Sequence, residues 1–327
     1  MGPLLLRLIA LVGAAVLGYE LFKKKPKDKV FSISRVSNCH EVFQTFNLNL
    51  NIPSSKRQLL IQSRQAIENK LKEYFKSKGT GEVPKTWIQG SYKLGTIIRT
   101  KNDTCDVDMG LYFFLKPSIE PATLLQNVNR ALNDHTTGAR SIKRKCVRIN
   151  YSNNFHIDIP IYYRDQIKNK QWLATKEYGW EESDPKLFWD WFKHKTAGKP
   201  QLIRVIRYAK AWLNNYSVKT GRKPPSGLAL TIWYIKNFVP HQRDDASFFY
   251  SSLKLLEQLS GHVGVWDCRM PVRPQDDLII RTDEFQRRNF KEGLKQMLGA
   301  ATGAVTADSK DEAAQIWKAI FGKWFPE

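Results

Sequence analysis

Cysteine is scarce in this chain, and its few copies follow no metal-binding spacing. There are four among 327 residues: Cys39, Cys105, Cys146 and Cys268. No two of them form a C-x-x-C pair, so a zinc ribbon is not expected. Four such cysteines are typical of reduced thiols in a cytosolic protein. The sequence also has no internal repeat and no sustained heptad pattern, which excludes solenoids and coiled coils.

Acidic residues are outnumbered by basic ones. Lysine and arginine total 52 against 31 aspartates and glutamates, which gives a formal net charge of +21 and a pI near 9.8. The first 30 residues hold a net +4 of this charge, so +17 belongs to the rest of the chain. Such a surplus attracts polyanions, namely nucleotides, nucleic acids or an anionic membrane face, without selecting among them. The length and the 42% hydrophobic content are sufficient for a full core, in one bilobed unit or two domains.

Long hydrophobic runs are absent except near the N-terminus. Leu4–Phe22 is apolar apart from Arg7, Tyr19 and Glu20, and Lys23–Lys29 follows it with five lysines. Nineteen helical residues span about 28 Å, roughly one hydrocarbon core. The positive-inside rule places the lysine-rich flank in the cytoplasm. We therefore expect a single-pass inner-membrane anchor with the rest of the chain in the cytoplasm. A cleaved signal peptide and a misplaced start codon are the alternatives.

A strand followed by a Gly-Ser turn and a helix start is predicted between Trp87 and Thr96. Gly90 lets the backbone approach a ligand that a Cβ atom would block. Ser91 offers a hydroxyl and the free N–H groups of a helix start, which together suit a phosphate. Alone, a Gly-Ser turn is common and indicates little.

Three aspartates are predicted to share one side of a sheet. Asp106 and Asp108 precede and enter a strand-like run, Val107–Leu115, and alternate residues of a strand share a face. Two neighbouring carboxylates repel each other unless a cation lies between them, and hard oxygen ligands suit Mg²⁺ together with substrate phosphates. Phe155–Ile161 alternates in the same way, with Asp158 on its polar face. On a neighbouring strand, Asp158 would complete a two-metal carboxylate set.

These motifs resemble those of the cGAS/DncV-like nucleotidyltransferases (CD-NTases), which belong to the polymerase β-type superfamily. The resemblance rests on Gln-Gly-Ser-Tyr-Lys at Gln89–Lys93 and on Asp-Val-Asp-Met-Gly at Asp106–Gly110, and it extends from about Phe43 to the C-terminus. It implies an α/β (α+β) fold with a small mixed sheet in the catalytic domain and a helical C-terminal domain. We expect an anchor over residues 1–30, a nucleotidyltransferase domain over 31–171 and a helical nucleotide-binding domain over 172–327. The implied activity joins NTPs into a cyclic di- or oligonucleotide signal for anti-phage defence, which reaches a downstream effector.

The same resemblance implies roles for individual residues. Asp106, Asp108 and Asp158 would be catalytic and hold two Mg²⁺ ions, with Mn²⁺ as a possible substitute. Three residues of the Gly-Ser turn would bind nucleotide: Gln89, Gly90 and Ser91.

Two further nucleotide contacts are expected in the C-terminal half. A helix over 201–216 carries Arg204, Arg207 and Lys210 largely outside its apolar stripe, and three such cations alone would indicate a solvated face. The resemblance implies instead that Lys210 holds the donor triphosphate. Ser226 is predicted to cap the following helix, and the resemblance adds a phosphate contact.

A basic run over residues 140–148 precedes Asp158. Such a run is usually solvated, but it could also line the acceptor nucleotide. Arg148, on a predicted strand near Asp158, is the candidate for that contact.

Other helices are expected from apolar periodicity, with a flexible break over 299–303. Their ranges are 58–75, 121–133, 228–238, 248–259, 282–298 and 308–321.

Two alternatives remain open. The same acids would serve a template-free transferase that tails RNA or nucleotidylates protein. The second alternative is a basic, membrane-tethered nucleic-acid sensor that has no catalytic activity. The presence of all three acids argues against this alternative. Nucleic acid is thus a possible partner but not a required one.

Overall fold

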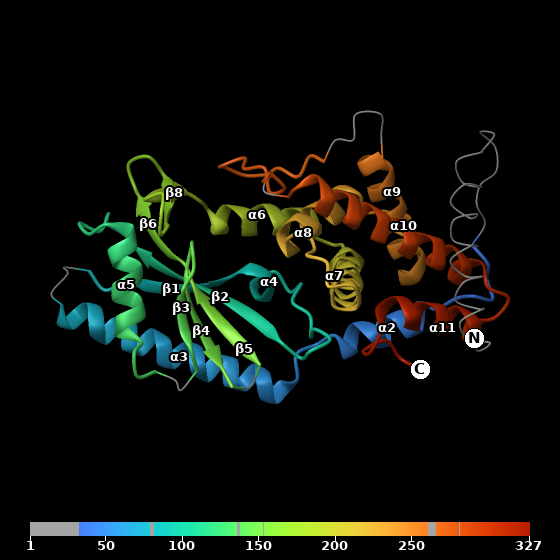
Figure 1. The fold of residues 1–327 in the computed structure, drawn as a ribbon, viewed down its shortest axis with the longest axis horizontal. Helices are drawn as coiled ribbons and strands as arrows, with labels where there is room; N and C mark the ends of the chain where they lie inside the picture. The colour runs from blue at the N-terminus through green and yellow to red at the C-terminus, as the bar shows by residue number, and fades with distance from the viewer. Residues whose placement is uncertain (1–32, 79–81, 136–137, 153, 261–265, 281) are drawn as a thin grey trace. The chain divides into compact units, whose positions relative to one another are not determined.

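The computed structural model describes residues 33–78, 82–135, 138–152, 154–260, 266–280 and 282–327 (Figure 1). The expected anchor over Leu4–Phe22 lies outside these ranges. Within them, no helix has the length and apolar character that crossing a membrane requires.

The chain divides into two compact units. One, the sheet unit, comprises Ile52–Lys195 and Met270–Asp276. The other, the helical unit, comprises the described part of Met1–Asn51 together with Thr196–Arg269 and Asp277–Glu327. The sequence placed the start of the helical part at Trp172, but Trp172 pairs with Tyr163 in the sheet, and this pairing keeps the segment in the sheet unit.

The sheet unit is built on one mixed sheet, as expected. Its strand order is β3-β4-β5-β2-β6-β7-β8, and β1 pairs with β2. The central strand β2 runs parallel to β5 and β6 and antiparallel to β1. The strands are β1 Lys85–Gln89, β2 Cys105–Phe113, β3 Arg140–Ile142, β4 Val147–Tyr151, β5 Phe155–Ile159, β6 Ile161–Asp165, β7 Lys170–Ala174 and β8 Trp180–Glu182.

The strand expected over Phe155–Ile161 is two strands. It is interrupted at Pro160, which has no N–H group to donate to a ladder. The first half of β2 pairs with β5 and its second half with β6, while the Leu111 N–H donates to the Pro160 carbonyl. Both pieces therefore stay beside β2, and the face predicted for Asp158 is retained.

One face of the sheet is covered by two helices, α3 (Ser54–Ser77) and α5 (Pro121–Ala131) (Figure 1). Both contribute to the core that contains the odd-numbered residues of β2, from Cys105 to Phe113. Since alternate residues point to opposite faces, the even positions 106 and 108 lie on the other side of the sheet. The other described helices of this unit are α4 (Gly90–Lys93) and α6 (Pro185–Thr196), the latter ending at the boundary with the helical unit.

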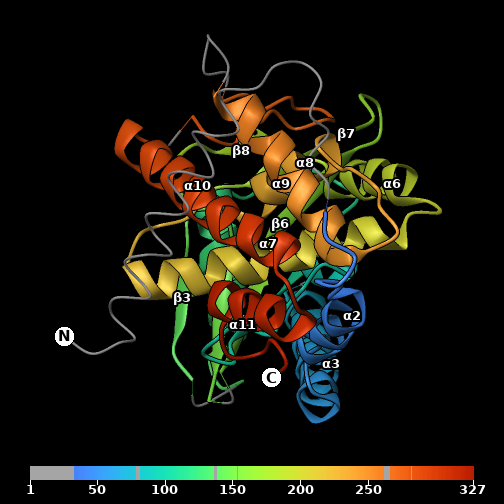
Figure 2. The ribbon, with the colours of Figure 1, turned by 90° about the vertical axis from the view of Figure 1, so that its right-hand side faces the viewer.

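The helical unit packs around an aromatic core, and the helices that surround this core are drawn in Figure 2. The Phe43 ring lies 5.0 Å, centroid to centroid, from the rings of both Tyr208 and Trp317, in edge-on geometry. Its helices are α2 His40–Asn49, α7 Pro200–Thr220, α8 Gly227–Lys236, α9 Asp244–Ser260, α10 Glu284–Thr306 and α11 Lys310–Phe321.

The flexible break expected over 299–303 is wrong. Helix α10 continues through it to Thr306. Ala301 and Ala304 are fully buried there, and a Cβ atom on Gly303 would lie 3.7 Å from Ile316 of α11. The small residues allow α11 to pack closely against α10, and this contact outweighs the low helix propensity of glycine.

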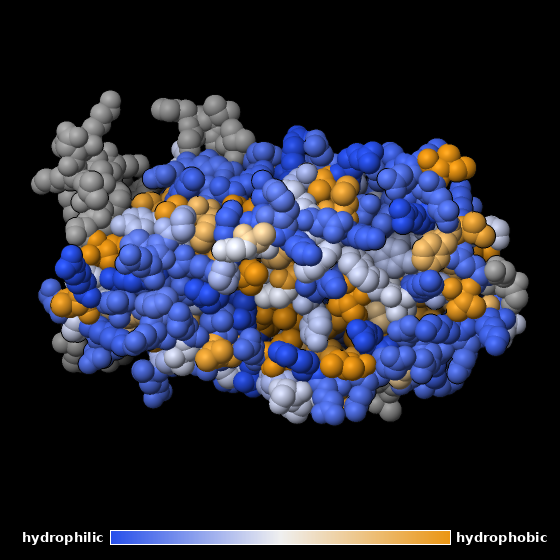
Figure 3. Space-filling model, turned by 180° about the vertical axis from the view of Figure 1, so that it is seen from behind, coloured by the Kyte–Doolittle hydropathy of each residue, from blue (hydrophilic) through white to orange (hydrophobic). Residues whose placement is uncertain are grey.

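Hydrophilic side chains cover most of the face drawn in Figure 3, with hydrophobic ones interspersed. A chain in which 25% of residues are charged is expected to present such a surface.

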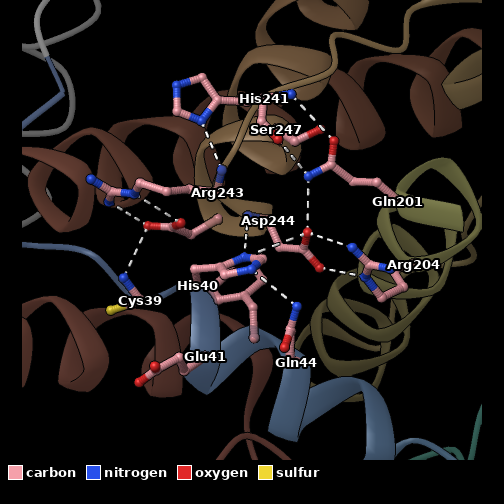
Figure 4. A network of polar contacts seen from close by, with 12 residues as sticks. Cys39, His40, Glu41, Gln44, Gln201, Arg204, His241, Arg243, Asp244 and Ser247 are labelled. Carbon is pink, nitrogen blue, oxygen red and sulfur yellow. Dashed lines mark hydrogen bonds and ion pairs between the residues drawn. The ribbon is translucent and has the colours of Figure 1, made fainter. Parts of the chain in front are cut away.

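The expectation that Arg204 and Arg207 lie on a solvated face is wrong. Arg204 donates Nε and Nη2 to the carboxylate of Asp244, at 2.6 and 2.9 Å, and Asp244 has no exposed surface (Figure 4). Arg207 is 7% exposed, and its Nη2 donates to Asn51 at 2.8 Å. Burial lowers the pKa of Arg207 to about 10. Both arginines therefore join helices inside the unit.

Candidate active site

Three aspartates are brought side by side by two parallel strands. In β2, Cys105, Val107 and Met109 point into the core, which leaves Asp106 exposed and Asp108 half-buried on the opposite face. The register of β2 and β5 then places Asp158 directly beside Asp108. Parallel register thus gathers carboxylates that are 50 residues apart in the chain.

The Gly-Ser turn touches this acid cluster. Gln89, the last residue of β1, pairs with Asp108. Gly90 then turns the chain with φ +66°, and a Cβ atom built there would lie 1.8 Å from Oδ2 of Asp108. Glycine is therefore required twice, by the backbone angle and by the neighbouring carboxylate. Ser91 follows in the first turn of α4, half-buried, with its carbonyl accepting from the N–H groups of Thr96 and Ile97.

The Gln89 side chain is engaged by tyrosines. Its Nε2 donates to the Tyr162 hydroxyl at 3.0 Å, and its Oε1 accepts from the Tyr112 hydroxyl at 2.9 Å. The two rings stack with centroids 4.8 Å apart. Burial raises the pKa of both hydroxyls far above the ordinary value, so both keep their protons at neutral pH. The two tyrosine hydroxyls therefore fix the position of the Gln89 side chain at the start of the turn.

Arg148 contacts Asp158 directly. The hairpin of β4 and β5 sets these residues opposite each other. The guanidinium donates hydrogen bonds from Nε and Nη2 to the two carboxylate oxygens, each at 2.7 Å. The hydrogen bonds to Asp158 raise the pKa of Arg148. This pair was not predicted from the sequence. Only three residues separate Tyr151 from Phe155, so a tight hairpin between the two predicted strands would have set Arg148 opposite Asp158.

His156 was also given no role, although the alternation placed it on the same face as Asp158. It pairs in register with Asp106. Burial, and then the charge of Arg148, lower the pKa of His156, so its imidazole is neutral near pH 7. Cys146 lies close to Asp158, and burial raises its pKa to about 12. All four cysteines of the chain are free, as expected.

The chemistry of the donors fits a divalent cation, since carboxylate oxygens are the preferred ligands of Mg²⁺. Asp106 and Asp108 offer such oxygens from one strand, and Asp158 offers two more beside them. Asp158, however, is hydrogen-bonded to Arg148. Within the described ranges, no three acidic, histidine or cysteine side chains are grouped closely enough to hold a metal ion as they stand.

The two nucleotide-binding candidates of the helical unit lie together. Ser226 caps α8, its hydroxyl accepting from the Ala229 N–H at 3.1 Å, so its own proton can still be donated. Lys210 of α7 reaches the same helix start, because its Cε lies 3.8 Å from the position of a Cβ on Gly227. A helix N-terminus, a hydroxyl and an ammonium group are complementary to phosphate.

Comparison with known proteins agrees with this geometry. Residues 84–162, which hold the Gly-Ser turn and all three aspartates, match the family described as the nucleotidyltransferase domain of cyclic GMP-AMP synthase DncV-like proteins. A cyclic GMP-AMP synthase of Escherichia albertii is 30% identical over 242 residues, 68% of this chain and 54% of that protein. A c-di-GMP synthase of Roseivirga ehrenbergii is 27% identical, over 72% of this chain and 71% of its own.

Solved structures support the fold. The GTP-bound form of Vibrio cholerae DncV has a TM-score of 0.77 at 19% identity, over 89% of this chain and 96% of that one. Another form of the same protein, with ATP, GTP and 5MTHFGLU2, has a TM-score of 0.75. At this identity the likeness concerns the fold. The chain spans about half the length of the E. albertii relative. Residues 84–162 therefore form a nucleotidyltransferase domain of the cGAS/DncV-like family.

Proposed function

We propose that this protein is a nucleotidyltransferase that joins NTPs into a cyclic di- or oligonucleotide. The observation that carries the proposal is the register of β2 and β5, which sets Asp158 beside Asp108 and next to the turn at Gly90. This arrangement suits in-line attack of a ribose hydroxyl on the α-phosphorus of an NTP. The new P–O bond forms as the bond to pyrophosphate breaks, and a second round closes the ring.

Within this reaction, the chain's own groups hold charges and positions. Asp106 and Asp108 would bind the cation that accompanies the triphosphate, and Asp158 would join them at the attacking hydroxyl. Divalent cations supply polarisation of the phosphoryl oxygens and a lowered hydroxyl pKa. The Gly90–Ser91 backbone and the Ser91 hydroxyl offer donors to phosphate oxygens. Lys210 and Ser226 offer an ammonium group and a hydroxyl at one helix start to the donor triphosphate, and Arg148 is the candidate for the acceptor.

Both ATP and GTP are proposed as substrates. The two relatives are named for different products, cyclic GMP-AMP and c-di-GMP, and DncV has been solved with GTP and with both nucleotides. We further propose Mg²⁺ or Mn²⁺ as the metal and anti-phage signalling through a downstream effector as the biological role, which the family resemblance implies.

Radiolabelled NTPs test the proposal. The purified full-length chain is incubated with Mg²⁺ and each α-labelled NTP, singly and mixed, and the products are digested with phosphatase. A small, phosphatase-resistant product is expected, because ring closure leaves no terminal phosphate. Label in RNA or protein would support a tailing or protein-modifying enzyme instead. The incubation is repeated with extract from infected cells, which would supply an activator if the enzyme needs one. No product under either condition counts against the proposal.

A further inference from the structure

The ion pair between Arg148 and Asp158 occupies a carboxylate that a bound metal ion would also need. Nε donates to Oδ1 and Nη2 to Oδ2, both at 2.7 Å, in the bidentate geometry that makes arginine–carboxylate pairs strong. Each bond occupies one lone pair of its own oxygen, so the two bonds together take about half of the acceptor sites of the carboxylate. The side chains are 32% and 12% exposed, so the pair is partly shielded from water.

Asp158 also lies beside the other acids of the sheet. It pairs with Arg148 across β4 and β5, and with Asp108 across β5 and β2. One acid thus lies between an arginine on one side and the proposed cation ligands on the other. A divalent cation at Asp106 and Asp108 and the guanidinium at Asp158 carry like charges and would approach the same two oxygens.

We propose that Arg148 is the resident counter-cation of Asp158 and competes with divalent cations for it. The third carboxylate would join the metal set only as Arg148 releases it. This inference rests on the proposed function for the identity of the cation. Since linkage is reciprocal, a group that competes for Asp158 must weaken metal binding, and its removal must strengthen it.

The test measures Mn²⁺ binding without any nucleotide. The full-length protein is stripped with EDTA, desalted and titrated with Mn²⁺, and free Mn²⁺ is followed by electron paramagnetic resonance. Arg148→Gln is expected to bind Mn²⁺ at least about fivefold more tightly than the wild type, the lower end of usual coupling between sites. Arg148→Lys keeps the charge but loses the fork, so an intermediate affinity is expected.

Two further variants make the result specific. Asp158→Asn should abolish the gain, so that Arg148→Gln has no effect in that background. Arg144→Gln is the matched control, because Arg144 lies in the same basic run but pairs with Glu181, at 2.8 Å. It removes one positive charge without touching Asp158, and its Mn²⁺ affinity should equal that of the wild type.

Unchanged or weaker Mn²⁺ binding in Arg148→Gln would overturn the proposal, as would an equal gain in Arg144→Gln. If Arg148→Gln does not fold, as judged by circular dichroism, Arg148→Lys decides the matter alone by the same criterion. The readout does not involve product. If the wild type makes product but Mn²⁺ affinity does not change on substitution of Arg148, this inference alone is overturned. If the protein does not join NTPs, the proposed function alone is overturned.

Discussion

At the scale of single residues, Gly90 is held to glycine by two features of its surroundings. Its positive φ and its approach to the Asp108 carboxylate are separate constraints, and the chain contains a position that has only the first. Gly95 has φ +68°, and a Cβ atom added there would have nothing within 4 Å. The pair of glycines therefore separates backbone strain from contact with the site.

Gly90→Ala should strongly reduce product formation, whereas Gly95→Ala should not. Both variants incur left-handed strain of about 1–2 kcal/mol, measurable by urea unfolding. Gly90→Ala alone forces Asp108 to move, so its initial rate should fall at least about tenfold below that of Gly95→Ala. Equal rates in the two variants would show that the contact with Asp108 is not needed.

Asp106→Asn or Asp108→Asn should abolish product while the fold is retained. The amide keeps the size of the side chain but removes the charge that a cation requires. Loss of polarisation worth several kcal/mol corresponds to about a thousandfold in rate. Rates are compared at saturating Mg²⁺, with Asp190→Asn, an exposed residue of α6, as the control. Near-normal activity in either active-site variant would contradict the metal assignment.

At the scale of elements, alternation and local turn signals predicted much of the sheet unit. The polar faces of β2 and β5 and the turn at Gly90 all follow from period-2 patterns and short-range chemistry. The helical wheel of α7 gave a wrong prediction for Arg204 and Arg207, both of which have partners inside the helical unit. A wheel records polarity around one helix, whereas the partners Asp244 and Asn51 come from distant segments. The boundary at Trp172 differs for a local reason, because β7 pairs with its sequence neighbours β6 and β8 and so stays in the sheet.

The ion pair between Arg204 of α7 and the buried Asp244 of α9 should contribute strongly to the resistance of the fold to acid unfolding. Burial acts to raise the pKa of Asp244, but hydrogen bonds from Arg204 and Gln201 outweigh it, and the pKa is lowered. An acid with a lowered folded-state pKa stabilises the fold above its unfolded value, about 3.9, and loses this contribution as the pH falls through the folded value. The contribution is thus fully present at pH 7 and disappears below about pH 4.

Arg204→Gln should cost about 3–5 kcal/mol at pH 7, because it leaves a buried carboxylate without its cation. The acid-unfolding midpoint should also move to higher pH, since Asp244 would no longer be held ionised. Urea and acid titrations followed by circular dichroism measure both. The control is Arg288→Gln, which breaks an exposed pair with Glu284, 69% and 87% exposed, and should change stability by less than about 0.5 kcal/mol. Equal effects in the two variants would remove Asp244 from this role.

Lys210→Ala should impair NTP use more than stability. A charge-assisted phosphate contact is worth about 1.5–3 kcal/mol, or about tenfold to a hundredfold in kcat/KM. Lys199→Ala, at the exposed start of the same helix, removes an equal charge away from α8 and serves as the control. Unchanged KM and kcat in Lys210→Ala would exclude Lys210 from triphosphate binding.

At the scale of the whole molecule, composition separates an N-terminal segment from the rest. The apolar run Leu4–Phe22, the lysine-rich run Lys23–Lys29 and the folded chain beyond them have distinct patterns. We propose that this segment places the protein at the inner membrane, with the catalytic part facing cytosolic NTPs. The lysine run would add about 1 kcal/mol per residue of attraction to anionic lipid.

Deleting residues 1–30 should move the protein from the membrane fraction to the supernatant while NTP chemistry persists in vitro. The Gly-Ser turn begins about sixty residues later, so the segment is expected to locate the enzyme and not to act on substrate. Fractionation by ultracentrifugation and the labelled-NTP assay give the two readouts. A lysine-to-glutamine variant of Lys23–Lys29 separates lipid charge from apolar insertion, because it should weaken but not abolish membrane association. Full-length protein in the supernatant, or cleaved protein in the periplasm, would rule out the anchor; lost activity in a folded deletion variant would give the segment a role beyond tethering.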